Sequence, residues 1–193
     1  PPNSIAGFEF KDNVVLHPAN MASNISSATV SGNRFDPVLP GDEILLISLQ
    51  NSTVTDNTFE GNDDIACLLL WGSQFNLVPS EHVTISENTF SDCGNPSSTS
   101  NYAIQLSQGV HHIDITNNEI SNGVEGVNTD DTALWDVTNE IHINFNNITD
   151  NTSFGVRNGQ MGVLDAECNW WGAADGPGPV GPGSGDNVST NVD

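Results

Sequence analysis

The stretch Val83-Thr-Ile-Ser-Glu-Asn88-Thr-Phe90 carries the pattern on which the fold depends. Apolar side chains at Val83 and Ile85 alternate with polar ones, which is typical of a short strand with one buried face. We expect Asn88 to turn the chain, because asparagine tolerates left-handed backbone and hydrogen-bonds its neighbours. Phe90, two residues later, then brings an apolar side chain back to the core.

Seven copies of this pattern run through the chain, and their asparagines are 20, 24, 31, 30, 28 and 23 residues apart. A strand, a turn and a return at such intervals describe one coil of a solenoid. Stacked coils pair each strand in parallel with its copy in the next coil, and crossovers between parallel strands are nearly always right-handed. The sequence therefore predicts an all-β, right-handed parallel β-helix of about seven coils. Its asparagines should form a hydrogen-bonded ladder, made of Asn13, Asn33, Asn57, Asn88, Asn118, Asn146 and Asn169.

Further strands are expected between the copies, at residues 44–49, 65–70, 102–106, 124–127 and 154–156. Long helices are not expected. The β-helix domain is predicted to cover residues 1–176. Residues 177–193 are rich in glycine and proline, which indicates an extended tail or linker.

The repeats resemble the right-handed parallel β-helix proteins, a class that includes pectate lyases, polygalacturonases and many envelope proteins. The segment Cys168-Asn-Trp-Trp-Gly-Ala-Ala-Asp-Gly-Pro177 resembles a motif that closes β-helices in secreted surface proteins of archaea and some bacteria. This resemblance implies an extracellular or cell-surface protein without an assigned reaction. On physical grounds alone, Trp170 and Trp171 are expected to cover the last coil.

The charge of the chain is extreme. Asp and Glu number 25 against 3 Lys and Arg, which gives a formal net charge of -22, and 25 residues are asparagine. Three basic side chains cannot neutralise many phosphates, so nucleic acid is excluded as a partner, and an anionic membrane is disfavoured. High salt screens the self-repulsion of such a chain. A halophilic origin is therefore the favoured interpretation, and an ordinary acidic secreted protein is the alternative.

Two residue types bear weakly on location. Three cysteines, Cys67, Cys93 and Cys168, have no zinc-binding spacing and leave at least one thiol unpaired, so their pairing stays open. Five Asn-x-Ser/Thr sequons provide possible glycosylation sites at Asn24, Asn51, Asn147, Asn151 and Asn187.

A catalytic interpretation is the minority one. Lyases with this fold use a basic residue as general base, and Arg157 is the single one in the later coils. Hydrolases with this fold use several carboxylates. The segment Asn128-Thr-Asp-Asp131 resembles their Asn-Thr-Asp motif, but the other motifs of those enzymes are missing. If the chain is an enzyme, it is a polysaccharide hydrolase that uses Asp130, Asp131 and Asp136.

Long insertions between strands carry aromatic and acidic side chains together. Trp71 and Trp135 are candidate sugar-binding residues, because aromatic rings stack on sugars; the alternative is that they cover coil edges. The carboxylates of Asp130, Asp131 and Asp136, together with those of the 63–64 and 42–43 pairs, are candidate calcium ligands, although no calcium-binding loop motif is present. No cofactor is otherwise expected.

His82 and His112 each lie six residues before a ladder asparagine. They should therefore stack in neighbouring coils, about 5 Å apart. With His111 alongside, these imidazoles are weak candidates for a transition-metal site. A surface histidine pair without metal is the alternative.

The leading hypothesis is a non-enzymatic surface module, structural, adhesive or filament-forming, whose partners are other surface-protein chains or glycans. The runner-up is a carbohydrate-active enzyme or glycan-binding protein. The first coil offers exposed strand edges, and such edges template further pairing. Head-to-tail self-assembly or cover by another part of the protein is therefore a prediction, with a blunted monomer as the alternative.

Overall fold

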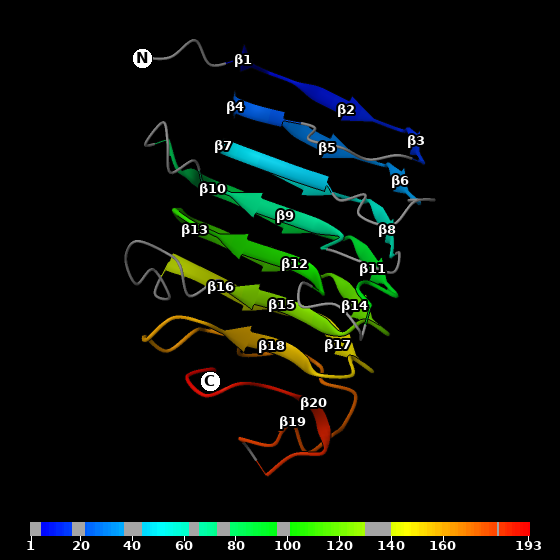
Figure 1. Ribbon diagram of the computed structural model, residues 1–193, viewed down its shortest axis with the longest axis vertical. Helices are drawn as coiled ribbons and strands as arrows, with labels where there is room; N and C mark the ends of the chain where they lie inside the picture. Colours follow the sequence, from blue (N-terminus) through cyan, green and yellow to red (C-terminus); the bar gives the residue numbers. More distant parts are fainter. Residues whose placement is uncertain are drawn as a thin grey trace.

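The computed structural model describes residues 5–16, 22–36, 44–61, 66–72, 78–95, 101–129, 140–180 and 182–193. Within these ranges the chain is a parallel β-helix, and Figure 1 shows its coils stacked from the N-terminus at the top to the C-terminal segment at the bottom. Within the coils, the strand pairings are parallel and join equivalent positions of successive coils. The predicted fold class is confirmed.

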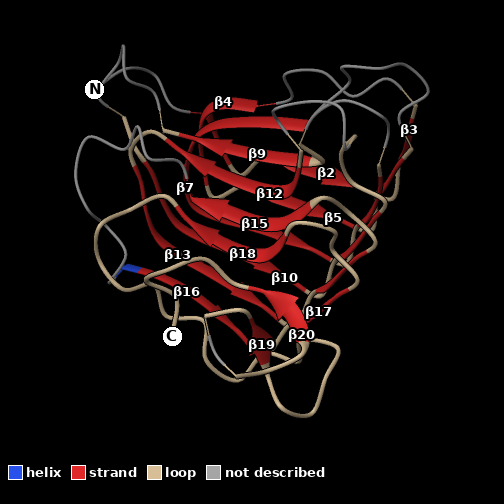
Figure 2. Ribbon diagram, turned by 60° about the horizontal axis from the view of Figure 1, so that its bottom comes forward, coloured by secondary structure: helices blue, strands red, loops and turns tan. Residues whose placement is uncertain are grey.

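One sheet contains twelve strands and covers two faces of the helix, whose strand stacks Figure 2 shows. The two faces are joined by β7 (Ile44–Thr55), which pairs with strands of both. The other members are β1 (Ile5–Ala6), β2 (Glu9–Lys11), β4 (Ala22–Ser26), β5 (Thr29–Ser31), β9 (Leu68–Trp71), β10 (Ser80–Ser86), β12 (Tyr102–Ser107), β13 (Val110–Thr116), β15 (Glu125–Thr129), β16 (Ile141–Asn144) and β18 (Phe154–Asn158).

The third face is a sheet of six short strands that follow the asparagine turns. They are β3 (Val14–Val15), β6 (Arg34–Phe35), β8 (Thr58–Glu60), β11 (Thr89–Ser91), β14 (Glu119–Ser121) and β17 (Asn147–Thr149). A separate pair, β19 (Pro177–Gly178) and β20 (Gly185–Asn187), lies beyond the coils.

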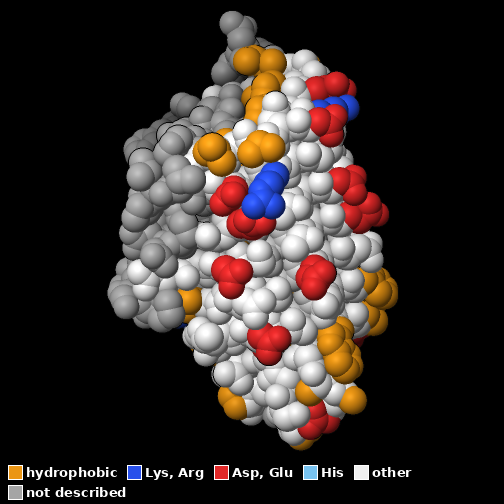
Figure 3. Space-filling view, turned by 90° about the vertical axis from the view of Figure 1, so that its right-hand side faces the viewer, with side chains coloured by type: hydrophobic (Ala, Val, Ile, Leu, Met, Phe, Trp, Pro, Cys, Tyr) orange, Lys and Arg blue, Asp and Glu red, His pale blue; other side chains and the backbone are white. Residues whose placement is uncertain are grey.

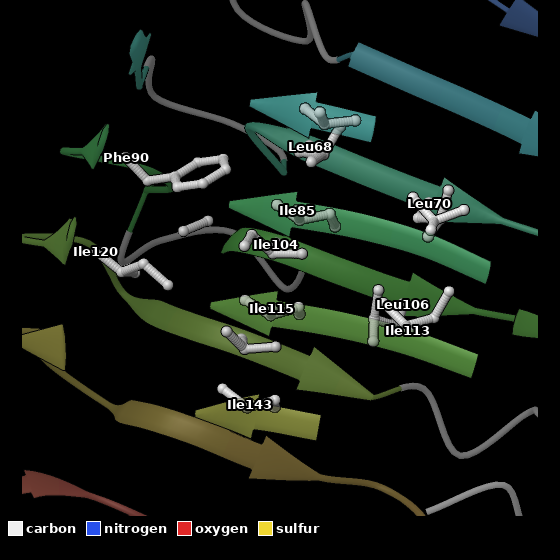
Figure 4. Packing of buried hydrophobic residues seen from close by; sticks show 14 of the residues in the cluster. Leu68, Leu70, Ile85, Phe90, Ile104, Leu106, Ile113, Ile115, Ile120 and Ile143 are labelled. Atoms are coloured by element: carbon white, nitrogen blue, oxygen red, sulfur yellow. The ribbon is translucent and has the colours of Figure 1, made fainter. Parts of the chain in front are cut away.

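Inward side chains form columns because the coils stack in register. Figure 4 shows Ile85, Ile115 and Ile143 one above another, from β10, β13 and β16. Phe35, Phe59 and Phe90 form a second column on the third face, with ring centroids 4.9 and 4.4 Å apart. These six side chains are at most 1% exposed, so the alternating apolar positions of the repeat build one continuous core.

The asparagine ladder runs the length of the described chain. From Asn13 to Asn169, each asparagine Nδ2 donates to the Oδ1 of the next, at 2.9–3.0 Å. The backbone differs from the expectation in one respect: the residue before the asparagine turns the chain. Asp56, for example, has φ 56° and Glu87 has φ 58°. The ladder asparagines are thereby free to point their amides inward, where they satisfy backbone groups of the turn.

The C-terminal segment also differs from the expectation of an extended tail. Val188 is 3% exposed and forms a β-bridge to Val156, and Val192 forms one to Leu164. Residues 182–193 therefore lie against the last coils. Trp171, 6% exposed, is part of the core there, whereas Trp170 is half exposed. Apolar valines among the polar residues explain this return of the chain.

The first coil exposes apolar side chains. Ile5, Val14 and Leu16 are 61%, 68% and 47% exposed, and β1 and β3 lie at the ends of their strand stacks in Figure 1. Within the described residues, no helix is long and apolar enough to cross a membrane.

Candidate functional site

A histidine column lies at the corner where the two faces of the large sheet meet. His82 and His112 have left-handed backbone, with φ 54° and 53°, as does Asn51 at the equivalent place in β7. The ring centroids of His82 and His112 are 4.6 Å apart, close to the predicted spacing, and the ring planes are tilted by 42°. The next position of this column is Glu140, because the following residue, Ile141, pairs with Ile113.

A second column runs beside the first. His111 pairs with Glu81 of β10, which pairs with Gln50 of β7. The Gln50 amide donates to Glu81 Oε1 at 3.1 Å, and Glu81 Oε2 lies 3.6 Å from His111 Nε2. The exposed fractions of the Glu81 and His111 side chains are 29% and 17%. Packing within this column restricts the orientation of the His111 ring.

The two columns bring three ligand-type atoms together. His111 Nδ1 and His112 Nδ1 are 2.8 Å apart, and Glu140 Oε2 lies 3.6 Å from the first and 3.4 Å from the second. Nearby, His142 Nδ1 lies 3.1 Å from Asp114 Oδ1 on the neighbouring strands β16 and β13. Sequence reasoning missed Glu140, although it too lies six residues before a ladder asparagine, Asn146. The same offset rule would have found it.

These side chains line a shallow, open concavity of about 290 Å³. Its walls come from three successive coils and consist of His82, Thr84, His112, Asp114, Glu140 and His142. Imidazole and carboxylate groups that converge on one hollow are suited to cation binding.

Of the other predicted ligand and catalytic residues, Trp71 alone lies within the described residues. Trp71 is half-buried, and its Nε1 donates to Gln108 Oε1 at 2.7 Å, so the indole is held against the neighbouring coil. Trp135 lies outside the described residues. So do Asp130, Asp131 and Asp136, which belong to both the catalytic and the calcium hypotheses, and the other acidic residues of the calcium hypothesis, at 42, 43, 63 and 64.

The sequons fall in three environments. Asn51 and Asn187 are exposed, whereas Asn24 and Asn147 are half-buried. Asn151 is 7% exposed, and its Nδ2 donates to Asp186 Oδ2 at 2.7 Å. A glycan on that nitrogen would replace this hydrogen bond.

A smaller hollow of about 190 Å³ lies near the C-terminus. Its Asp186 accepts hydrogen bonds from both Asn151 N and Asn151 Nδ2. Burial of the carboxyl nevertheless raises the pKa of Asp186, because desolvation outweighs these hydrogen bonds, and the charge of Asp150 acts in the same direction. Asp186 thus lies in the last turn of the chain and accepts hydrogen bonds from the coil before it.

Comparison with known proteins identifies the family. The family model described as "Right handed beta helix region" matches residues 3–168. The chain belongs to this family, and the hand of the solenoid predicted from the crossover rule agrees with it. A search of curated proteins and a search of solved structures each found no match.

Proposed function

We propose that the chain is a salt-adapted β-helix module of an extracellular or cell-surface protein, with a structural or adhesive role. The observation that carries this proposal is the disulfide between Cys67 and Cys93, which crosses 26 residues of sequence. Structural disulfides persist in oxidising compartments and are rare in the cytosol of mesophiles. Cys168 is exposed and unpaired, so two of the three cysteines form the bridge and the third is a free thiol.

The surface charges support adaptation to salt. Each of the three basic side chains lies beside carboxylates: Lys11 beside Glu9, Arg34 beside Asp36 and Glu60, and Arg157 beside Glu125. On the face seen in Figure 3, the other carboxylates are scattered without a basic neighbour. Their repulsion is unscreened in dilute buffer and disfavours the compact state.

The architecture suits a rod. The core and the ladder continue from coil to coil, so a load along the axis is borne by stacked hydrogen bonds and packed columns. Other surface chains or glycans are the partners of such a module in our proposal. The exposed side chains of the first coil, Ile5, Val14 and Leu16, are where head-to-tail self-assembly would begin.

Two measurements test this proposal. Thermal melts in about 0.1 M and about 3 M KCl should differ by many degrees, with the high-salt form the more stable. Protein recovered from the native host without reducing agent should have one free thiol by Ellman titration, from Cys168. Equal melting temperatures would remove the salt adaptation, and three free thiols in freshly lysed cells would place the chain in a reducing compartment.

The alternative function is a carbohydrate-active or glycan-binding β-helix. Its candidate carboxylates lie outside the described residues, and it stays a prediction. Release of reducing ends from acidic glycans, lost in Asp130→Asn, would establish it and contradict the structural role.

A further inference from the structure

We propose that His111, His112 and Glu140 form a binding site for one divalent transition-metal ion, with His82 beside it. The site lies at the corner of three successive coils. It is independent of the structural role proposed above, because a β-helix without this site would have the same core and ladder.

The distances between the three atoms are those of a metal site. His111 Nδ1, His112 Nδ1 and Glu140 Oε2 are separated by 2.8, 3.4 and 3.6 Å. A point equidistant from atoms so placed lies about 1.9 Å from each of them, and Zn–N and Zn–O bonds are about 2.0–2.2 Å long. An ion slightly above the plane of the three atoms therefore reaches all of them without a change of backbone. Ligand atoms around a tetrahedral ion with such bonds are about 3.3 Å apart, near the mean of the three distances.

The histidine pair also limits where protons sit. Two Nδ1 atoms 2.8 Å apart cannot both carry hydrogen, because the two hydrogens would collide between the rings. At least one Nδ1 lone pair therefore points at the other ring. A metal ion bound to both nitrogens uses both lone pairs at once.

Groups behind the ligands are arranged to support this use of Nδ1. When Nδ1 of His111 binds metal, its hydrogen is on Nε2, and Glu81 Oε2 lies 3.6 Å from that nitrogen. Glu81 is itself held by the Gln50 amide at 3.1 Å. A carboxylate behind a ligating imidazole fixes the ring orientation and raises ligand basicity. On its other side, His112 packs against the tilted ring of His82, which lines the open hollow.

The donor set selects the class of metal. Two imidazole nitrogens and one carboxylate suit Zn²⁺, Cu²⁺ and Ni²⁺, whereas Mg²⁺ and Ca²⁺ prefer oxygen ligands alone. The net charge of -22, together with Glu81 and Asp114 near the site, attracts cations to this surface. Because the ligands come from β13 and from the residue before β16, a bound ion links two coils and stabilises the folded state.

The chain itself supplies variants that should fold. In β7 the positions equivalent to His111 and His112 are Gln50 and Asn51, and Asn51 has the same left-handed backbone as His112. His111→Gln and His112→Asn therefore place residues that the same corner already accepts. All proteins carry Cys168→Ser, because an exposed thiol binds these metals by itself.

The experiment is calorimetric titration of chelator-stripped protein with Zn²⁺ and, separately, Cu²⁺, at high salt and with excess Mg²⁺ to occupy surface carboxylates. We expect one ion per chain for the parent, and at least a 10-fold weaker affinity for Glu140→Gln. His111→Gln and His112→Asn should each weaken binding by about 100-fold or more. Electron paramagnetic resonance of the Cu²⁺ form should show hyperfine coupling to two nitrogens, reduced to fewer in either histidine variant.

The control is Glu119→Gln, the same change as Glu140→Gln at an exposed position of β14, on the third face of the helix. Glu119 lies outside the three-atom set and outside the hollow, so this variant should bind as the parent does. Binding of several ions that Mg²⁺ displaces would overturn the proposal. So would a parent without binding, or histidine variants that bind as tightly as the control.

Discussion

Replacing Asn88 in the middle of the ladder should destabilise the protein far more than replacing Asn13 at its end. The Asn88 Nδ2 donates to Val54 O, to Ser86 O and to Asn118 Oδ1, at 2.9–3.0 Å. Its Oδ1 accepts from the backbone N and from the side-chain Nδ2 of Asn57, at 3.0 and 2.9 Å. Asn88 is 1% exposed, so water does not reach these groups.

The expected magnitude follows from the groups that lose their partner. Asn88→Ala leaves the backbone N of Asn57 and the carbonyl of Val54 without this amide in the core, and each buried unsatisfied group costs about 1–3 kcal/mol. Asn57 Nδ2 keeps two carbonyl acceptors. The total is therefore about 2–6 kcal/mol. For a chain of this size, 1 kcal/mol shifts the melting temperature by about 2–4 °C, so a loss of about 10 °C is expected.

Asn13→Ala is the matched control. Asn13 is half-buried, and its Nδ2 donates to Lys11 O and Asn33 Oδ1. Lys11 is exposed, so water replaces the amide there, and the expected loss is less than about 1 kcal/mol. Asn88→Asp removes the amide donors and keeps an acceptor. Its carboxylate would face the carbonyl oxygens of Val54 and Ser86, so at pH 7 it should destabilise the protein at least as much as alanine does.

The assay is calorimetric melting at one high salt concentration, accompanied by urea titration followed by tryptophan fluorescence. Equal shifts for the alanine variants at 13 and 88 would refute the ladder energetics. In that case the amides would make no net contribution, and apolar packing alone would hold the coils together.

Two further predictions concern the disulfide and the last turn. Cys67→Ser should lower the free energy of unfolding by about 2–4 kcal/mol, because the bridge joins residues 26 apart in the sequence, while Cys168→Ser should leave it unchanged. Urea titration with and without reductant measures both variants. Equal effects of the two substitutions would contradict this expectation. The raised pKa of Asp186 means that the folded state binds its proton more tightly, so this contribution to stability is full below about pH 4 and is lost as pH rises through the raised pKa. As pH rises from 4 to 7, Asp186→Asn should therefore gain stability relative to wild type. If the variant instead loses stability relative to wild type over this range, desolvation of the Asp186 carboxyl is not the dominant effect.

Positions at a fixed offset from the ladder asparagine were predictable from sequence. The apolar residues three before and two after Asn88, Ile85 and Phe90, are 0% exposed as expected. The spacing of His82 and His112 was predictable by the same rule. The rule works because residues at the same offset from the ladder asparagine become neighbours when the coils stack. The hydrophobic pattern fixes the register of that stacking.

Other features depend on details that offsets do not contain. The pairing of Cys67 with Cys93 requires the paths of two turns, and three cysteines allow three pairings. The return of the last segment depends on Val188 and Val192. Composition does not predict it, because glycine and proline dominate this segment. The shift of left-handed backbone from Asn88 to Glu87 reflects the needs of the inward amide, which composition does not show.

Backbone conformation offers a rival explanation for the histidine column, and the His112→Asn variant separates the two. Histidine, like asparagine, is enriched at positive φ, so His82 and His112 suit the corner without any ligand. This explanation does not extend to His111, which lies in β13 and pairs in regular register with Glu81 of β10. It also does not account for a carboxylate of Glu140 within 3.4 Å of His112 Nδ1. If backbone preference alone chose these residues, His112→Asn would keep both stability and metal affinity. Retained stability with lost affinity is the result that only a metal site predicts.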